Sequence, residues 1–146
     1  PRTWRRSISA TNCAPSTEMA RLLIVDDEPS LVLLMRFVLE KSGHQIEEAR
    51  HGKEALAKLG VSPENLDVVL PDLVLLDVMM PIMDGFAVAS ALRDCPRTAK
   101  LPILIVTAKG DMRPLFEAMP QVAGFFQKPF DPSSLREAVA RAIAPR

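Results

Sequence analysis

The stretch LLIVDDEPS, residues 22–30, sets four apolar residues against two adjacent aspartates and a proline. A short apolar run that ends abruptly in charged residues is typical of a strand buried on both faces of a parallel sheet. Two carboxylates about 4 Å apart repel each other by roughly 4 kcal/mol at an effective dielectric constant near 20. Asp26 and Asp27 therefore either point into water from a loop or share a cation.

The composition is that of one globular domain. The chain has 146 residues, of which 48% are apolar and 25% charged, enough for a single packed core. Its 18 basic and 18 acidic side chains give no net charge, which argues against generic binding of nucleic acid. Cys13 and Cys95 have neither metal-ligand nor redox spacing, so a reducing cytoplasm is favoured.

The first 18 residues differ from the rest of the chain. They are polar, show no hydrophobic period, and lack the apolar segment that a secretion signal needs after its basic residues. No apolar stretch approaches the roughly 18–20 residues that span a bilayer. We predict a flexible extension over residues 1–18, one domain over residues 19–146, and no membrane contact.

Strand and helix patterns alternate along this domain. Strands are predicted at residues 22–25, 45–49, 72–77, 101–106 and 124–127, and helices near residues 29–42, 52–59, 86–93, 113–119 and 132–143. Such alternation predicts an α/β fold with a parallel sheet covered by helices on both faces.

Two helices have a clear apolar period. The first is expected to bury Leu31, Leu34, Met35, Val38 and Leu39. The last is expected to begin after an Asp131 cap and to bury Leu135, Ala138, Val139, Ala142 and Ile143.

Polar residues stand where the predicted strands end. Asp26 and Asp27 follow the first strand, Asp77 ends the third, Thr107 the fourth and Lys128 the fifth. The carboxyl ends of parallel strands share one edge of the sheet, which is where ligands bind in such folds. Carboxylate oxygens suit Mg²⁺, and a lysine with a hydroxyl suits an anionic group. The set favours phosphoryl transfer onto a carboxylate.

Each of these residues also has a simpler interpretation. Asp77 alone could cap a turn, Thr107 could merely end a strand, and Lys128 could be a solvated loop lysine. Their joint occurrence at successive strand ends favours a site.

Four motifs carry a resemblance to a known family. They are VDDEP at residues 25–29, LLDVMMPIMDG at 75–85, IVTA at 105–108 and KPF at 128–130. With them, residues 22–144 resemble the receiver domain of bacterial two-component response regulators. The resemblance implies a flavodoxin-like sheet of five parallel strands in the order 2-1-3-4-5.

The resemblance also implies roles for the site residues. Asp77 would be the phosphoacceptor and nucleophile. Asp27, Asp77 and the backbone carbonyl of Met79 would bind Mg²⁺, or Mn²⁺ in its place, and Asp26 would act through a metal-bound water. Lys128 would pair with the phosphoacceptor carboxylate and then with a phosphoryl oxygen.

A conformational switch is implied as well. Thr107 would reorient towards the phosphoryl group and Phe125 would change rotamer with it, switching a surface formed by the fourth helix, the fifth strand and the fifth helix. The family often has a cis peptide at the position of Lys128–Pro129, and an X-Pro bond lowers the cost of cis to about 1 kcal/mol or less.

The implied partners are proteins. A histidine kinase or a histidine phosphotransfer protein would supply the phosphoryl group, and an unknown downstream protein would receive the signal, without direct nucleic-acid binding. The chain would catalyse its own phosphorylation and dephosphorylation in the cytoplasm without being an enzyme for a separate substrate.

The sequence departs from the family in three places. Asp27 and Asp77 are 50 positions apart (77 − 27), a few more than usual, which predicts an enlarged segment over residues 60–71. Pro114 and Pro120 shorten the fourth helix. Met79 and Lys109 occupy positions that tune phosphate lifetime, so that lifetime is left open.

Three alternatives stay open at this point. The chain is either a stand-alone receiver or a fragment of a larger regulator or hybrid kinase. A pseudo-receiver that binds without phosphorylation usually lacks an acidic residue or the lysine, all of which are present here. A metal-dependent phosphatase would carry its nucleophile after the first strand in a DxD pattern. His44 and His51 are predicted to be surface residues.

Overall fold

The computed structural model describes residues 20–80, 82–108, 113–128 and 131–143. Strands and helices alternate along them, as the apolar pattern predicts. The strands are β1 (Arg21–Val25), β2 (Gln45–Ala49), β3 (Leu73–Leu76), β4 (Ile103–Thr107) and β5 (Val122–Gln127). The helices are α2 (Pro29–Lys41), α3 (Gly52–Lys58), α4 (Gly85–Asp94), α5 (Arg113–Glu117) and α6 (Pro132–Ile143).

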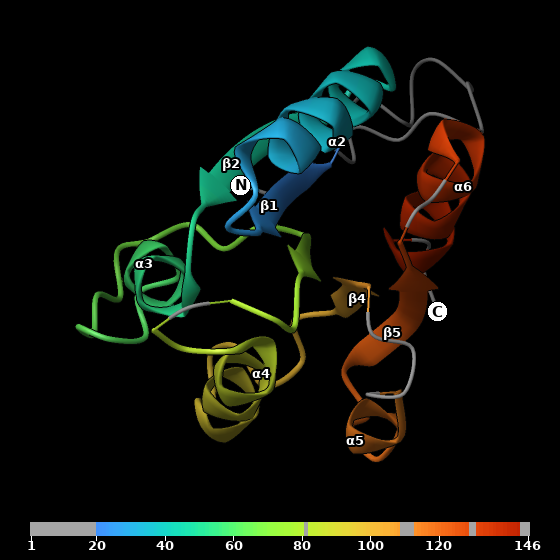
Figure 1. Ribbon diagram of the computed structural model, residues 1–146. Helices are drawn as coiled ribbons and strands as arrows, with labels where there is room; N and C mark the ends of the chain where they lie inside the picture. Colours follow the sequence, from blue (N-terminus) through green and yellow to red (C-terminus); the bar gives the residue numbers. More distant parts are fainter. Residues whose placement is uncertain (1–19, 81, 109–112, 129–130, 144–146) are drawn as a thin grey trace.

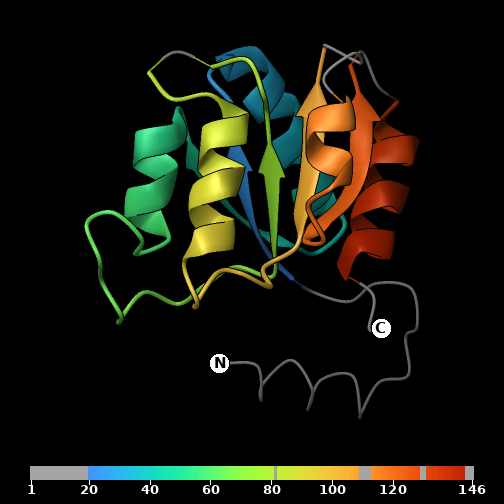
Figure 2. The ribbon, with the colours of Figure 1, turned by 90° about the horizontal axis from the view of Figure 1, so that it is seen from below.

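The five strands form one parallel sheet in the order β2-β1-β3-β4-β5, which confirms the predicted topology. Figure 1 shows α2 and α6 on one side of this sheet and α3, α4 and α5 on the other. The three-layer arrangement places every strand's carboxyl end on the same edge of the molecule (Figure 2).

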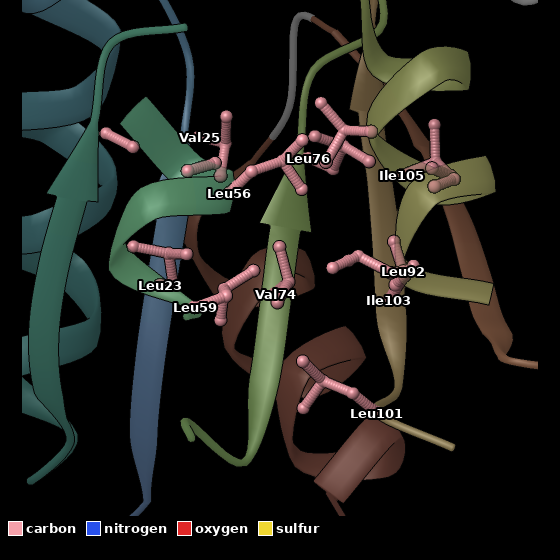
Figure 3. Close-up of a cluster of buried hydrophobic side chains, with 14 of the residues drawn as sticks. Leu23, Val25, Leu56, Leu59, Val74, Leu76, Leu92, Leu101, Ile103 and Ile105 are labelled. Carbon is pink, nitrogen blue, oxygen red and sulfur yellow. The ribbon is translucent and has the colours of Figure 1, made fainter. Parts of the chain in front are cut away.

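Two hydrophobic clusters hold these layers together. Successive residues of a strand point to opposite faces, so Leu23 and Val25 of β1 pack towards α3, α4 and α5, while Leu22 and Ile24 pack towards α2 and α6. Figure 3 shows the first cluster, in which side chains from three strands meet those of α3 and α4. Burial on both faces explains why the central strands are continuous apolar runs.

The buried face of α2 differs in part from the prediction. Met35, Val38 and Leu39 are buried as expected, but Leu34 is exposed and Val32 takes its place. The face that meets the sheet is centred on Met35, and an immediate neighbour in a helix is rotated by about 100° from it. Apolar content alone does not say which of two adjacent residues faces the core.

The predicted inner face of α6 is confirmed. Leu135, Val139 and Ala142 are buried, and Ala138 and Ile143 pack against the same cluster from its margin. The Asp131 carboxylate accepts a hydrogen bond from the Ser134 N–H at 3.1 Å, which is the predicted N-cap.

The enlarged segment at residues 60–71 has an ordered backbone. The Asn65 N–H donates to the Gly60 carbonyl at 2.9 Å. The Arg97 guanidinium donates to the carbonyls of Asn65 at 3.2 Å and Val68 at 2.9 Å. Arg97 therefore fixes this segment to the connection between α4 and β4, at the end of the sheet opposite the strand tips (Figure 2).

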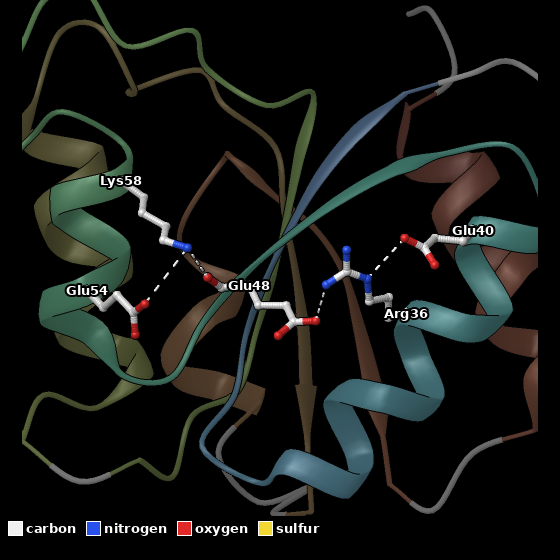
Figure 4. A network of polar contacts seen from close by, with 5 residues as sticks. All are labelled: Arg36, Glu40, Glu48, Glu54 and Lys58. Atoms are coloured by element: carbon white, nitrogen blue, oxygen red, sulfur yellow. Dashed lines mark hydrogen bonds and ion pairs between the residues drawn. The ribbon is translucent and has the colours of Figure 1, made fainter.

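Charged side chains line the outer strand β2 (Figure 4). The Arg36 guanidinium of α2 pairs with Glu48 and, at 3.0 Å, with Glu40. From the other side, the Lys58 ammonium of α3 donates to the Glu48 backbone carbonyl and lies 3.8 Å from Glu54. Exposed pairs of this kind add little stability, but charges on an edge strand oppose pairing with another chain.

Some predictions fall outside the described residues. These are the extension over residues 1–18, Lys109, and the peptide bond between Lys128 and Pro129. Within the described ranges, no helix combines the length and the apolar character that crossing a bilayer requires.

Candidate functional site

The sheet brings the predicted residues together at its carboxyl edge. The ladder of backbone hydrogen bonds continues into the site: the Asp77 N–H donates to the Val25 carbonyl at 2.9 Å, and the Lys128 N–H donates to the Thr107 carbonyl at 2.8 Å. The site residues are therefore fixed by the sheet itself.

Three carboxylates form a cluster at this edge. Asp26, Asp27 and Asp77 each place a carboxylate oxygen within 4.8 Å of the others. Asp26 is 1% exposed and Asp77 5% exposed, whereas Asp27 faces solvent. The Asp26 carboxylate accepts a hydrogen bond from the Glu28 N–H at 3.0 Å. Oxygen ligands at this spacing, open to solvent on one side, fit a Mg²⁺ ion that keeps several waters.

Lys128 lies between the two buried carboxylates. Its ammonium is 2.9 Å from the Asp26 carboxylate and 3.7 Å from that of Asp77. The resemblance implies Asp77 as the partner, but the closer partner in the structure is Asp26. Asp26 is the most buried of the three acids, and a desolvated carboxylate gains most from a neighbouring cation.

The ionised form of the Asp77 carboxyl group remains unfavourable in spite of the Lys128 ammonium. Burial and the neighbouring charge of Asp26 raise its pKa from 3.8 to about 6, and Asp27 acts in the same direction. The Lys128 ammonium and the Met79 N–H lower the pKa but do not offset the rise. A divalent cation would favour the ionised form, which is the nucleophilic one.

An aromatic row lies beside the predicted switch residues. Thr107 is buried and Phe125 is partly buried on the neighbouring strand. The Phe125 ring lies 6.5 Å from that of Phe116 in α5, which in turn meets Phe86 of α4 edge to face at 5.7 Å. Neither Phe116 nor Phe86 was among the predicted site residues, although both lie within predicted helices.

The loop from Asp77 to α4 returns close to its starting point. The Gly85 N–H donates to the Val78 carbonyl at 2.8 Å, and a Cβ on Gly85 would lie 2.4 Å from the Asp77 carbonyl oxygen. Only glycine fits this approach. Ile82 has a φ of +71°, a left-handed conformation that costs an L-residue about 1–2 kcal/mol. Neither Gly85 nor Ile82 was predicted to have a role in the site, although both lie in the motif at residues 75–85.

A family model for the response regulator receiver domain matches residues 22–140, nearly the whole described chain. The chain belongs to the response regulator receiver domain family. It is thus a receiver domain of two-component signalling, in which response regulators receive phosphoryl groups from histidine kinases.

Several relatives share this receiver domain. The chain is 36% identical over 127 residues to the DNA-binding dual master transcriptional regulator RpaA of Synechocystis, covering 86% of this chain and 48% of that protein. It is 32% identical to Protein PilH of Pseudomonas aeruginosa, covering 86% of this chain and 99% of PilH. The chain thus spans about half the length of RpaA and nearly all of PilH.

A solved structure gives the same fold. The chemotaxis response regulator CheY4 of Vibrio cholerae superposes with a TM-score of 0.74 at 31% identity, covering 85% of this chain and 98% of that one. The receiver fold and the flavodoxin-like strand order predicted above are therefore confirmed.

Proposed function

We propose that this receiver domain accepts a phosphoryl group on Asp77 from a histidine kinase or a histidine phosphotransfer protein, in a Mg²⁺-dependent reaction that switches a protein-binding surface. The observation that carries the proposal is the cluster of three carboxylates with oxygens within 4.8 Å of one another, beside the Lys128 ammonium.

The proposed chemistry is a direct phosphoryl transfer. An Asp77 carboxylate oxygen forms a bond to phosphorus while the bond between phosphorus and the donor's imidazole nitrogen breaks. The electron pair of that bond stays on the nitrogen, and the other ring nitrogen keeps its proton, so neutral imidazole leaves. The chain catalyses this transfer and the later hydrolysis on itself, and has no separate substrate.

The residues present fit a resident Mg²⁺ ion. Asp26, Asp27, Asp77 and the Met79 backbone carbonyl would hold it, with Asp26 acting through a water. Mg²⁺, or Mn²⁺ in its place, supplies positive charge that offsets the crowded carboxylates and the phosphoryl oxygens. Lys128 lies 3.7 Å from Asp77, close enough to pair with a phosphoryl oxygen bound there.

The proposed switch runs through Thr107 and Phe125. A phosphoryl group on Asp77 adds charge and acceptor oxygens, and the Thr107 hydroxyl on the adjacent strand would turn to donate to it. The space that Thr107 vacates would admit the Phe125 ring, whose contact with Phe116 links it to α5. The output surface would then be α5, β5 and α6, repacked by a local electrostatic change.

The proposal also includes the bounds of the domain, its location and its partners. The receiver domain would occupy residues 19–146, after an extension over residues 1–18, either alone or as part of a larger regulator or hybrid kinase. It would act in the cytoplasm on protein partners, with no direct contact to nucleic acid or membrane. A non-phosphorylated pseudo-receiver is the second candidate, and the complete set of acids with Lys128 argues against it.

The test uses acetyl phosphate as a small phosphodonor. We expect wild type to be labelled in the presence of Mg²⁺, and both chelation and Asp77→Asn to abolish labelling. Asp94→Asn, an exposed aspartate on α4, is the matched control and should label as wild type does. Labelling of Asp77→Asn at the wild-type rate would refute the proposal.

The switch has its own test. Beryllofluoride, which mimics the phosphoryl group, should shift amide resonances of residues 113–128 in wild type. Thr107→Ala should still be labelled on Asp77 but lose most of these shifts. Equal shifts in both proteins would refute the coupling through Thr107.

A further inference from the structure

The loop between β3 and α4 carries an isoleucine in an unfavourable conformation. Within the described ranges, Ile82 is the residue other than glycine that has a positive φ, at +71°. Its side chain is branched at Cβ, which makes this conformation still less favourable. Glycine or asparagine would adopt the same backbone at less cost.

Burial of the side chain does not compensate for this strain. The Ile82 side chain is 68% exposed to solvent, so most of its apolar surface stays in water. In the isolated domain, the residue therefore contributes strain without a corresponding gain in packing. Strained residues that the fold does not need are concentrated at functional sites.

Ile82 lies close to the phosphoacceptor. Both ends of its loop are at Asp77, since Gly85 packs against the Asp77 carbonyl. Three Cα–Cα steps join Ile82 to Gly85, so their Cα atoms are at most about 11 Å apart. Met79 of the same loop is also exposed. The loop thus carries two exposed apolar side chains within five residues of the buried Asp77 carboxylate.

A further apolar side chain is exposed beside the carboxylates. A groove of about 220 Å³ runs from Asp26 and Asp27 along the start of α2, and Leu33, which lines it together with charged residues of β2 and the turn after it, is exposed. Exposed apolar residues next to a charged centre fit a protein surface better than a small hydrated anion.

We propose that Ile82 is a specificity-determining residue that contacts the protein phosphodonor, receiving an apolar side chain next to the donor's phosphohistidine. This inference rests on the proposed function. The Asp77 carboxylate is buried, so the donor's imidazole has to enter the site, and the surface around it then meets the loop that carries Ile82. A donor as small as acetyl phosphate makes no such contact.

The experiment compares two donors on three variants of the full chain. Ile82→Gly and Ile82→Asn remove the exposed side chain and relieve the strain. Leu66→Asn removes a side chain of nearly equal exposure, 66%, from the segment at the opposite end of the sheet. The donors are acetyl phosphate and a panel of purified, autophosphorylated histidine kinases, from which the fastest donor to wild type is taken.

Two results are expected together. Both Ile82 variants should have a higher urea midpoint than wild type. Their rate of transfer from the kinase, divided by their rate from acetyl phosphate, should fall about fivefold or more, as for a contact residue at an interface centre. Leu66→Asn should keep the wild-type ratio.

The contrary results are distinct. An unchanged ratio in both Ile82 variants, or an equal fall in Leu66→Asn, would overturn the role of Ile82. Labelling by acetyl phosphate with no transfer from any kinase in the panel would overturn the protein donor itself. Failure of wild type to accept phosphate from either donor would instead refute the proposed function.

Discussion

The two ends of the sheet use buried polar groups in opposite ways. At the carboxyl end, Asp26, Asp77 and Lys128 face one another in a small space, and the pKa of Asp77 rises to about 6. At the amino end, His44 and Gln121 bind backbone groups.

The contacts at the amino end tie connections to the sheet. The His44 Nδ1 atom accepts the Ala20 N–H at 3.1 Å, at the entry to β1. The Gln121 side-chain amide donates to the carbonyls of Thr98 at 3.1 Å and Leu101 at 2.8 Å, in the connection that enters β4. These polar side chains supply hydrogen-bond partners to backbone groups at the start of two strands.

The polar groups at one end of the sheet serve stability and those at the other end serve reactivity. We expect the contacts at the amino end to stabilise the folded chain, because the two hydrogen bonds of the Gln121 amide outweigh its buried Oε1, which has no partner among the described residues. At the carboxyl end, burial and the charge of Asp26 disfavour the ionised Asp77 carboxylate until a cation or a phosphoryl group arrives, as is typical of a group that must react. Substitutions at the two ends should therefore change stability in opposite directions.

The largest effect is expected for Asp77→Asn without divalent cations. A carboxyl group with a raised pKa contributes stability below pH 3.8, which is lost as the pH rises through about 6. Asparagine does not ionise, so at pH 8 the free energy of unfolding should rise by about 2–3 kcal/mol. Urea unfolding measures this free energy. Asp27→Asn, at the exposed acid, should be stabilised less than Asp77→Asn. If Asp77→Asn were destabilised, the proposed contrast between the two ends of the sheet would be wrong.

At the amino end, Gln121→Met should act in the opposite sense. Methionine cannot donate to the carbonyls of Thr98 and Leu101. The Thr98 carbonyl would still accept the Leu101 N–H at 3.0 Å. The free energy of unfolding should fall by about 1–2 kcal/mol. Gln127→Met, at an exposed glutamine of β5, is the control and should stay within about 0.5 kcal/mol of wild type. Equal effects of the two substitutions would mean that the Gln121 contacts add no stability.

The smallest effect concerns His44 and pH. Burial lowers the pKa of His44 from 6.5, against the opposing charge of Asp72. A histidine with a lowered pKa contributes stability above pH 6.5 that is lost as the pH falls through the lowered value. Below pH 6.5, the free energy of unfolding of wild type should therefore fall more steeply than that of His44→Gln. Parallel curves would show that the ring does not support the entry to β1.

The sequence predicted the fold because the apolar pattern is local. Runs such as residues 22–25 and 73–76 are strands in any setting that buries both faces, and the polar residue after each run marks the carboxyl edge. The convergence of Asp26, Asp77, Thr107 and Lys128 follows from parallel strands alone. The structure confirms that they meet; their roles in phosphoryl transfer stay predictions.

What could not be predicted depends on contacts between distant residues. The long Lys128 side chain can reach either buried acid, and only three-dimensional burial selects Asp26. His44 and His51 were predicted to be surface residues, but both are partly buried and accept backbone N–H groups through Nδ1.

The order of the segment at residues 60–71 and the backbone of Ile82 could not be predicted from local sequence either. The segment at residues 60–71 is ordered by Arg97, which lies 32 positions beyond Asn65. The positive φ of Ile82 is equally invisible in the sequence, because isoleucine is a residue type that argues against it.

The central claim is that a divalent cation relieves the crowded charge at the carboxyl end. Isothermal titration of the full chain with Mg²⁺ tests it directly, with Asp27→Asn as the variant and Asp67→Asn, an exposed aspartate of the 60–71 segment, as the control. We predict saturable binding to wild type and to Asp67→Asn, and binding about tenfold or more weaker to Asp27→Asn. Equal affinity of Asp27→Asn and wild type, or no binding to wild type, would contradict the account.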